Sequence, residues 1–94
     1  MPLEEFRKKI DALDETLLET LAKRMQVSSE IGAFKKKNGI AFKDPEREKQ
    51  LIASRRKLAE ELGLSPVFAE KLFRAILGES LKVQKQKKQA NEKL

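Results

Sequence analysis

Apolar residues recur every three or four positions along most of the chain, which is the period of one face of an α-helix. The pattern is clearest from Ile10, through Leu13 and Leu17, to Leu21. No segment shows the strict alternation of apolar and polar residues that is typical of a half-buried β-strand. The spacing therefore predicts an all-α protein.

The first predicted helix covers about residues 3–37 and is very long. Pro2 suits its first turn, and Asn38–Gly39 follows its end. At 1.5 Å per residue, such a helix is about 50 Å long. Neither of the two shorter helices that follow can cover its whole apolar stripe. We therefore expect a second copy to cover the rest, in an intertwined, all-helical homodimer of three-helix protomers.

The second and third helices are marked by their starting residues. Asp44 and Ser65 are N-cap residues, and each is followed by a proline at the first helical position. Gly63 ends the second helix. We expect residues 1–94 to form a single domain, in which the basic segment of about residues 85–94 is a frayed tail.

Cations interrupt the apolar stripe of the first helix. Continuing its spacing leads to Arg24 and Lys35, at positions where leucine would be expected. A buried cation without a counter-charge is costly, because it loses its hydration. No acidic residue continues this stripe. We therefore predict that an anionic ligand enters the core and neutralises both side chains.

Other polar residues also occupy inward positions of the three helices. They comprise charged and hydrogen-bonding side chains at Arg7, Arg47, Glu48, Ser80 and Gln84. Taken alone, each fits a solvated surface position, and Arg24 or Lys35 would also fit a solvated helix face. Their coincidence on the inward faces of three helices instead predicts one polar pocket within a helical bundle.

Composition narrows the chemistry of this pocket. The sequence has no Cys and no His, which removes thiol nucleophiles, serine–histidine pairs and the commonest transition-metal ligands. If the protein is an enzyme, we therefore expect a reaction that uses neither a nucleophile nor a metal, and positioning and electrostatics would have to carry the catalysis. The formal net charge of +6 favours an anionic partner. The chain has no apolar run long enough for a membrane helix and no secretory signal, so we expect a cytoplasmic protein without membrane association.

The order and spacing of these residues resemble the all-helical, bacterial type of chorismate mutase. The resemblance covers about Leu3 to Gln84 and rests on R7-x-x-I-x-x-L-D-x-x-L-L, A-x-R24, E-x-G-x-x-K35, D44-P-x-R47-E48 and E-S80-x-x-x-Q84. It implies an entwined dimer with two active sites. It also implies rearrangement of the dianion chorismate to prephenate, in phenylalanine and tyrosine biosynthesis, by a [3,3] sigmatropic shift without metal, cofactor or covalent intermediate.

The resemblance implies that arginines bind the carboxylates of the substrate. Arg24 would bind a carboxylate from within its own long helix, and Arg7 would reach the same site from the other protomer. Arg47 would add positive charge at the carboxylates, and Ser80 would lie near the carboxylate of the ring. The planar guanidinium suits these roles because it binds a carboxylate through two parallel hydrogen bonds.

The remaining roles concern the reacting bond and the ring. Lys35 and Gln84 would donate to the ether oxygen of the breaking C–O bond, where negative charge builds in the transition state. Donors aimed there stabilise the transition state more than the ground state. Glu48, together with the backbone near Asp44, would accept from the ring hydroxyl. With Arg24, the two ether-oxygen donors would be the catalytic residues.

Two other functions are compatible with the sequence. An isochorismate pyruvate-lyase of the same fold also binds a dianion with buried cations, but the D44-P-x-R47-E48 segment favours the mutase because Glu48 offers a carboxylate to the ring hydroxyl. A basic helical dimer that binds nucleic acid would place its cations on outward faces and would carry aromatic stacking residues. The Lys35–Lys37 run and the basic tail could contact phosphates, but no aromatic stacking platform is visible in the sequence. A length of 94 residues fits a free-standing enzyme or one domain of a larger one.

Overall fold

The computed structural model describes residues 2–86 of the chain. They form three helices, α1 (Pro2–Asn38), α2 (Pro45–Glu61) and α3 (Pro66–Lys85), and contain no strand. The all-α prediction is thereby confirmed, and α1 extends one residue further at each end than predicted. The predicted frayed tail lies outside the described residues, apart from its first two positions.

The helix ends follow the local chemistry of the sequence. The Asp44 side chain caps α2 by accepting from the backbone N–H of Arg47 at 3.1 Å, and the Ser65 hydroxyl caps α3 by accepting from the backbone N–H of Phe68 at 3.2 Å. Gly63, just beyond α2, has φ +80°, a conformation in which a Cβ would be strained. These caps satisfy backbone groups that a helix end leaves without partners.

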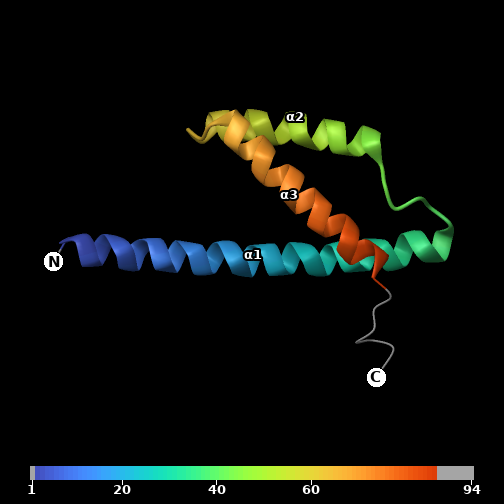
Figure 1. The fold of residues 1–94 in the computed structure, drawn as a ribbon, viewed down its shortest axis with the longest axis horizontal. Helices are drawn as coiled ribbons and strands as arrows, with labels where there is room; N and C mark the ends of the chain where they lie inside the picture. Colours follow the sequence, from blue (N-terminus) through green and yellow to red (C-terminus); the bar gives the residue numbers. More distant parts are fainter. Residues whose placement is uncertain (1, 87–94) are drawn as a thin grey trace, which may run out of the picture.

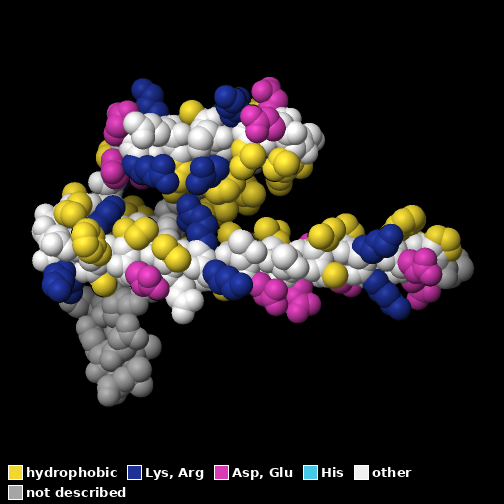
Figure 2. Space-filling model, turned by 180° about the vertical axis from the view of Figure 1, so that it is seen from behind, with side chains coloured by type: hydrophobic (Ala, Val, Ile, Leu, Met, Phe, Trp, Pro, Cys, Tyr) yellow, Lys and Arg dark blue, Asp and Glu magenta, His cyan; other side chains and the backbone are white. Residues whose placement is uncertain are grey.

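Helix α3 holds the other two helices together. It packs against both α1 and α2, whereas α1 and α2 do not pack against each other within residues 2–86. In Figure 1, α2 runs alongside α1 at a distance, and α3 slants from the α2 end to the C-terminal half of α1. Figure 2 shows the result as an open notch between α1 and the α2–α3 arm. The positions of α1 and α2 relative to each other are therefore set by α3.

The protomer is thin and elongated. It measures 55 × 35 × 14 Å, with a Cα radius of gyration of 16.7 Å, against about 12 Å for a compact domain of this length. Among the described residues the buried apolar set is small, consisting of Leu51, Ile52, Ala59, Ala69 and Ile76. A single protomer consequently has little apolar core with which to stabilise its fold.

An apolar row on α1 is left uncovered. Its members in the N-terminal half are 53–65% exposed: Leu3, Phe6, Ile10, Leu13 and Leu17. They alternate steps of three and four residues, the spacing of a seam between two packed helices. We call this row the α1 seam. Further along the helix the same spacing reaches Arg24.

A charged contact ties α2 to α3 near their junction. Glu70 of α3 accepts from Arg56 of α2 at 2.6 Å and from Arg74, one turn further along α3, at 2.8 Å. The hydrogen bonds from Arg74 and then Arg56 hold the pKa of Glu70 below its ordinary value. The carboxylate therefore stays ionised and bridges the two helices at neutral pH.

Candidate functional site

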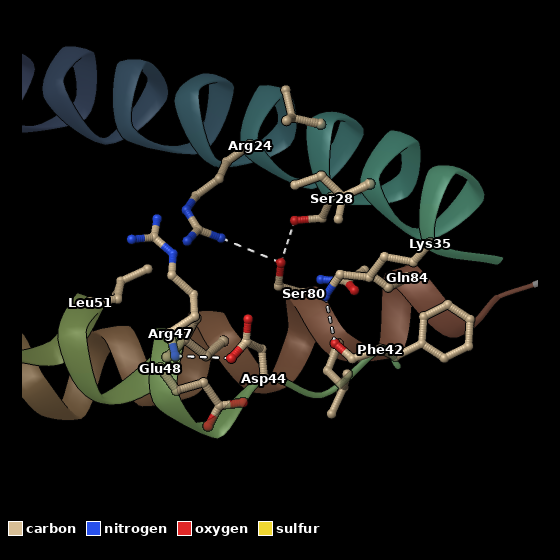
Figure 3. A pocket seen from close by; sticks show the side chains of 14 residues that line it. Arg24, Ser28, Lys35, Phe42, Asp44, Arg47, Glu48, Leu51, Ser80 and Gln84 are labelled. Atoms are coloured by element: carbon tan, nitrogen blue, oxygen red, sulfur yellow. Dashed lines mark hydrogen bonds between the residues drawn. The ribbon is translucent and has the colours of Figure 1, made fainter. Parts of the chain in front are cut away.

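A cavity of about 410 Å³ lies between α1, α2 and α3. This volume is within the range of small-molecule sites, roughly 300–1,000 Å³. Seven of the eight residues singled out in the sequence line it, drawn from all three helices and the connection before α2: Arg24, Lys35, Asp44, Arg47, Glu48, Ser80 and Gln84. Figure 3 shows these side chains around the hollow. The structure thus brings together residues that are up to 60 positions apart in the sequence.

Arg24 carries the positive charge between α1 and α2. Its guanidinium projects from α1 toward Arg47 of α2 (Figure 3), and its Nη1 is 3.5 Å from the hydroxyl of Ser80. Burial, followed by the nearby charges of Arg55 and Arg47, lowers the pKa of Arg24. A lowered arginine pKa means that the fold disfavours its positive charge. A bound anion would remove that penalty.

Arg55 is a cation near the cavity that the sequence analysis did not single out. Its guanidinium carbon lies 5.5 Å from the centre of the Phe73 ring, a cation–π contact between α2 and α3. Arg47, Leu51 and Arg55 are spaced four residues apart on α2, so they share one helix face. This four-residue spacing from Arg47 is the sequence pattern that indicates that Arg55 lies near the cavity.

Lys35 joins the end of α1 to the connection that leads to α2. Its ammonium group donates to the backbone carbonyl of Phe42 at 2.8 Å. An ammonium group has three donors, so this bond leaves others for a ligand. The sequence could not predict this partner of Lys35, because the acceptor is a backbone carbonyl and every residue has one.

Small and polar residues form the part of the contact between α1 and α3 that borders the cavity. The hydroxyls of Ser28 and Ser80, 4% and 6% exposed, are hydrogen-bonded to each other. One turn further along, Gly32 of α1 lies against the backbone of Gln84. The Oε1 atom of Gln84 is buried and has no hydrogen-bond partner within residues 2–86. This amide lines the cavity (Figure 3) and is available to a ligand.

The two carboxylates of the cavity are engaged differently. Asp44 caps α2, so its side chain is already in use. Glu48 turns its carboxylate away from Arg24 (Figure 3) and lies 3.7 Å from the ammonium of Lys43. A partly exposed ion pair of this length is weak. The Glu48 side chain can therefore exchange Lys43 for a hydrogen-bond donor inside the cavity at little cost.

Arg7 is the predicted site residue that the structure does not bring to the cavity. It is exposed on α1, seventeen residues before Arg24. At 1.5 Å per residue, the two positions are about 25 Å apart along a continuous helix. An arginine side chain cannot span that distance, so Arg7 of the same chain does not reach this cavity.

Residues 2–86 contain no group of three His, Cys, Asp or Glu side chains placed to hold a metal ion. None of the three helices combines the length and the apolar character needed to cross a membrane.

Comparison with known proteins shows which protein family this chain resembles. The family model described as chorismate mutase type II matches residues 6–85. The T-protein of Enterobacter agglomerans is 43% identical over 75 residues, covering 80% of this chain and 20% of the relative. The chorismate mutase of Methanocaldococcus jannaschii is 34% identical over 84 residues, covering 89% of this chain and 85% of the relative. The 4-amino-4-deoxychorismate mutase of Streptomyces pristinaespiralis is 28% identical over 83 residues, covering 88% and 64%.

The match includes all three helices and every residue that lines the cavity. The chain spans about a fifth of the length of the T-proteins of Enterobacter agglomerans and Haemophilus influenzae, and most of the length of the Methanocaldococcus jannaschii relative. Three helices of the predicted lengths and an uncompensated cation in the cavity between them agree with this match. The chain belongs to the chorismate mutase type II family.

Proposed function

We propose that this chain is a chorismate mutase, which converts chorismate to prephenate in aromatic amino acid biosynthesis. The observation that carries the proposal is the cavity in which Arg24 and Arg47 face each other, with no acidic partner for Arg24 among residues 2–86. A ligand with two carboxylates supplies the missing negative charge. The family match and the names of the more similar relatives support chorismate as that ligand.

The arginines bind the substrate and select its reactive shape. A [3,3] shift requires the enolpyruvyl arm of chorismate to fold over the ring. Arg24 from α1 and Arg47 from α2 bind carboxylates across the cavity and hold the arm and the ring in that arrangement. Binding in this way orders the two reacting parts before the reaction begins. The entropy cost of ordering them is therefore no longer part of the activation barrier.

Lys35 and Gln84 act on the bond that breaks. As the C–O bond stretches, negative charge develops on the ether oxygen. The ammonium of Lys35 and the amide N–H of Gln84 donate to that oxygen, and they are already positioned in the cavity before the substrate arrives. Donors fixed in this way stabilise the transition state without a cost of reorganisation. No proton is transferred, so neither residue has to change its ionisation state.

The ring is held at the opposite wall. Glu48 leaves Lys43 and accepts the single proton of the ring hydroxyl, and the backbone near Asp44 lies beside it. Ser80, between Ser28 and Arg24, donates toward the ring carboxylate. A carboxylate acceptor at the ring hydroxyl favours the mutase over an isochorismate pyruvate-lyase, whose substrate carries its hydroxyl elsewhere on the ring.

The test is to incubate the purified chain with chorismate, without added metal, and to identify the product. We expect prephenate, with loss of the chorismate absorbance at a rate that saturates with substrate. Release of pyruvate would instead identify a lyase. A chain that turns over only 4-amino-4-deoxychorismate would share the specificity named for the Streptomyces pristinaespiralis relative. Either outcome would contradict the proposed substrate and reaction.

We further propose that the functional unit is a homodimer. The α1 seam faces exposed apolar side chains at the α2–α3 junction, where Leu58, Leu62 and Phe68 are 47–67% exposed. Figure 2 shows apolar side chains on both sides of the notch. A second α1, running antiparallel to the first, would fill the notch and cover both apolar surfaces.

Arg7 gives the dimer a catalytic role. In an antiparallel pair, Arg7 of the partner lies level with Arg24 when the two-fold axis passes near residues 15 and 16. The apolar row continues past that point through Leu17 and Leu21. Each cavity would then receive a third arginine from the other chain, which a single chain cannot supply because α1 is rigid over the intervening 25 Å or so.

Subunit mixing tests this arrangement. We expect Arg7→Ala and Arg24→Ala homodimers each to be nearly inactive. After the two variants are unfolded together and refolded at equal amounts, half the dimers are mixed and each has one complete site. About a quarter of wild-type activity should therefore return. The matched control mixes Arg24→Ala with Lys35→Ala, whose lesions lie in the same half-site, and should regain nothing. Equal behaviour of the two mixtures would contradict a shared site.

A further inference from the structure

The contact between α1 and α3 has an unusual composition. Only two residues of α1, Ser28 and Gly32, are buried, although the helix carries many larger apolar side chains. They are four residues apart and lie opposite Ser80 and Gln84, which are also four residues apart on α3. On the α1 side, the buried part of this helix contact thus consists of a serine and a glycine that face two residues of the cavity wall.

Gly32 is required by the closeness of the two backbones. A Cβ added at this position would lie 2.6 Å from the Cα and 2.8 Å from the carbonyl carbon of Gln84, and closer still to its carbonyl oxygen. Such separations are far below van der Waals contact, and the obstructing atoms are backbone, so no side-chain rotation relieves them. A glycine inside a helix costs about 1 kcal/mol relative to alanine. Some property of the fold must offset that cost.

The atoms held by this contact belong to Gln84. Its Oε1 is buried without a partner in the part of the chain that the structure describes, so that end of the amide is not fixed by a hydrogen bond within the protein. The position of the amide in the cavity consequently depends on where the last turn of α3 lies against α1. Gly32 sets that position, and the Ser28–Ser80 hydrogen bond one turn earlier sets the register.

We propose that Gly32 is a positioning residue, which places the Gln84 amide for its interaction with the substrate by allowing the α3 backbone to touch α1. This inference rests on the proposed function. Gly32 itself contacts no substrate. It acts through the separation between α1 and the last turn of α3, which any larger residue would increase. That separation lies at Gln84 itself, whereas Arg24 and Arg47 belong to α1 and α2.

The main experiment compares the same substitution at two glycines. We expect Gly32→Ala to lower kcat about 10²-fold, because a displacement of about 1 Å at a catalytic group has an effect of that size, and to leave KM within a few-fold. Gly78→Ala is the matched control, since Gly78 is in α3 and a Cβ there meets nothing within 4 Å. It should retain wild-type kcat. A Gly32→Ala enzyme with wild-type kcat would overturn the proposal.

A double-mutant cycle separates positioning from a general loss of structure. If Gly32 acts through Gln84, the Gly32→Ala change should lower kcat less than about threefold when Gln84 is already alanine, because the two changes remove one and the same interaction. If Gly32→Ala costs the same 10²-fold in the Gln84→Ala background, the effect is not transmitted through Gln84, and the proposal fails.

A measurement on the unsubstituted protein needs neither folding of a variant nor catalytic activity. Nuclear Overhauser effects should connect the α protons of Gly32 with the backbone protons of Gln84, and the Gln84 side-chain amide should give one sharp pair of resonances. Absence of those contacts would overturn the proposal even if the chain turns over chorismate. Their presence in a chain without mutase activity would refute the proposed function and leave the helix contact itself established.

Discussion

Replacement of Arg24 by alanine is expected to lower kcat/KM for chorismate by about 30-fold to 4,000-fold. Truncating one partner of a buried, hydrogen-bonded charge pair costs roughly 2–5 kcal/mol, and each 1.4 kcal/mol is about tenfold. In the proposed enzyme–substrate complex, Arg24 is the α1 cation that binds a carboxylate. Its loss leaves that carboxylate without its partner and leaves the enolpyruvyl arm free to unfold. Arg24→Lys should recover only part of the activity, because an ammonium cannot form the bidentate contact.

The same substitution should not destabilise the free protein. Burial and the charges of Arg55 and Arg47 lower the pKa of Arg24, so its positive charge opposes folding in the absence of ligand. We therefore expect the melting temperature of Arg24→Ala to equal or exceed that of the wild type. Lys23→Ala, an exposed lysine one residue earlier, is the control and should change neither quantity. A parallel loss of stability and activity in Arg24→Ala would contradict a ligand-binding role.

Replacement of Lys35 by alanine is expected to lower kcat by about 10²–10³-fold, the usual effect of removing one donor at a developing oxyanion. KM should change much less, because the interaction with the ether oxygen strengthens as the bond breaks. Lys35→Gln should remain impaired, since it keeps a donor but loses the charge. Steady-state kinetics with chorismate measures both parameters.

Loss of Lys35 also removes its hydrogen bond to the Phe42 carbonyl, which should cost about 1 kcal/mol of stability. Thermal unfolding can detect that change, and it is too small to account for a 10²-fold loss in kcat. Lys37→Ala provides the control, because Lys37 belongs to the same run of lysines and is exposed. If Lys35→Ala were no more impaired than Lys37→Ala, Lys35 would not be the donor that stabilises the ether oxygen.

The helices could be predicted from the sequence because their signals are local. Asp44 and Ser65 each precede a proline and cap the next helix, and Gly63 takes the left-handed conformation where the second helix stops. Such signals act over a few residues, so the rest of the fold does not alter them. The predicted ends differ from the observed ends of α1 by a single residue.

Most of the candidate site was also predictable, for a related reason. Periodicity assigns each residue to a helix face. A charged residue on an apolar face, such as Arg24 or Lys35, indicates a polar site or a bound ligand in the core at that position. Residues from three faces of this kind must meet if the faces pack together. The sequence did not single out Arg55, although its spacing from Arg47 placed it on the same face.

Three helices, their ends and the residues that share each helix face follow from the sequence alone, because these depend on backbone geometry and on the period of the helix. Only the tertiary structure decided that α3 touches α1 at Gly32, that Lys35 donates to the carbonyl of Phe42, and that Arg7 lies too far along α1 to reach the cavity of its own chain. Those facts depend on distances between segments that are remote in sequence. Such distances follow from how the helices pack together and from no single residue type.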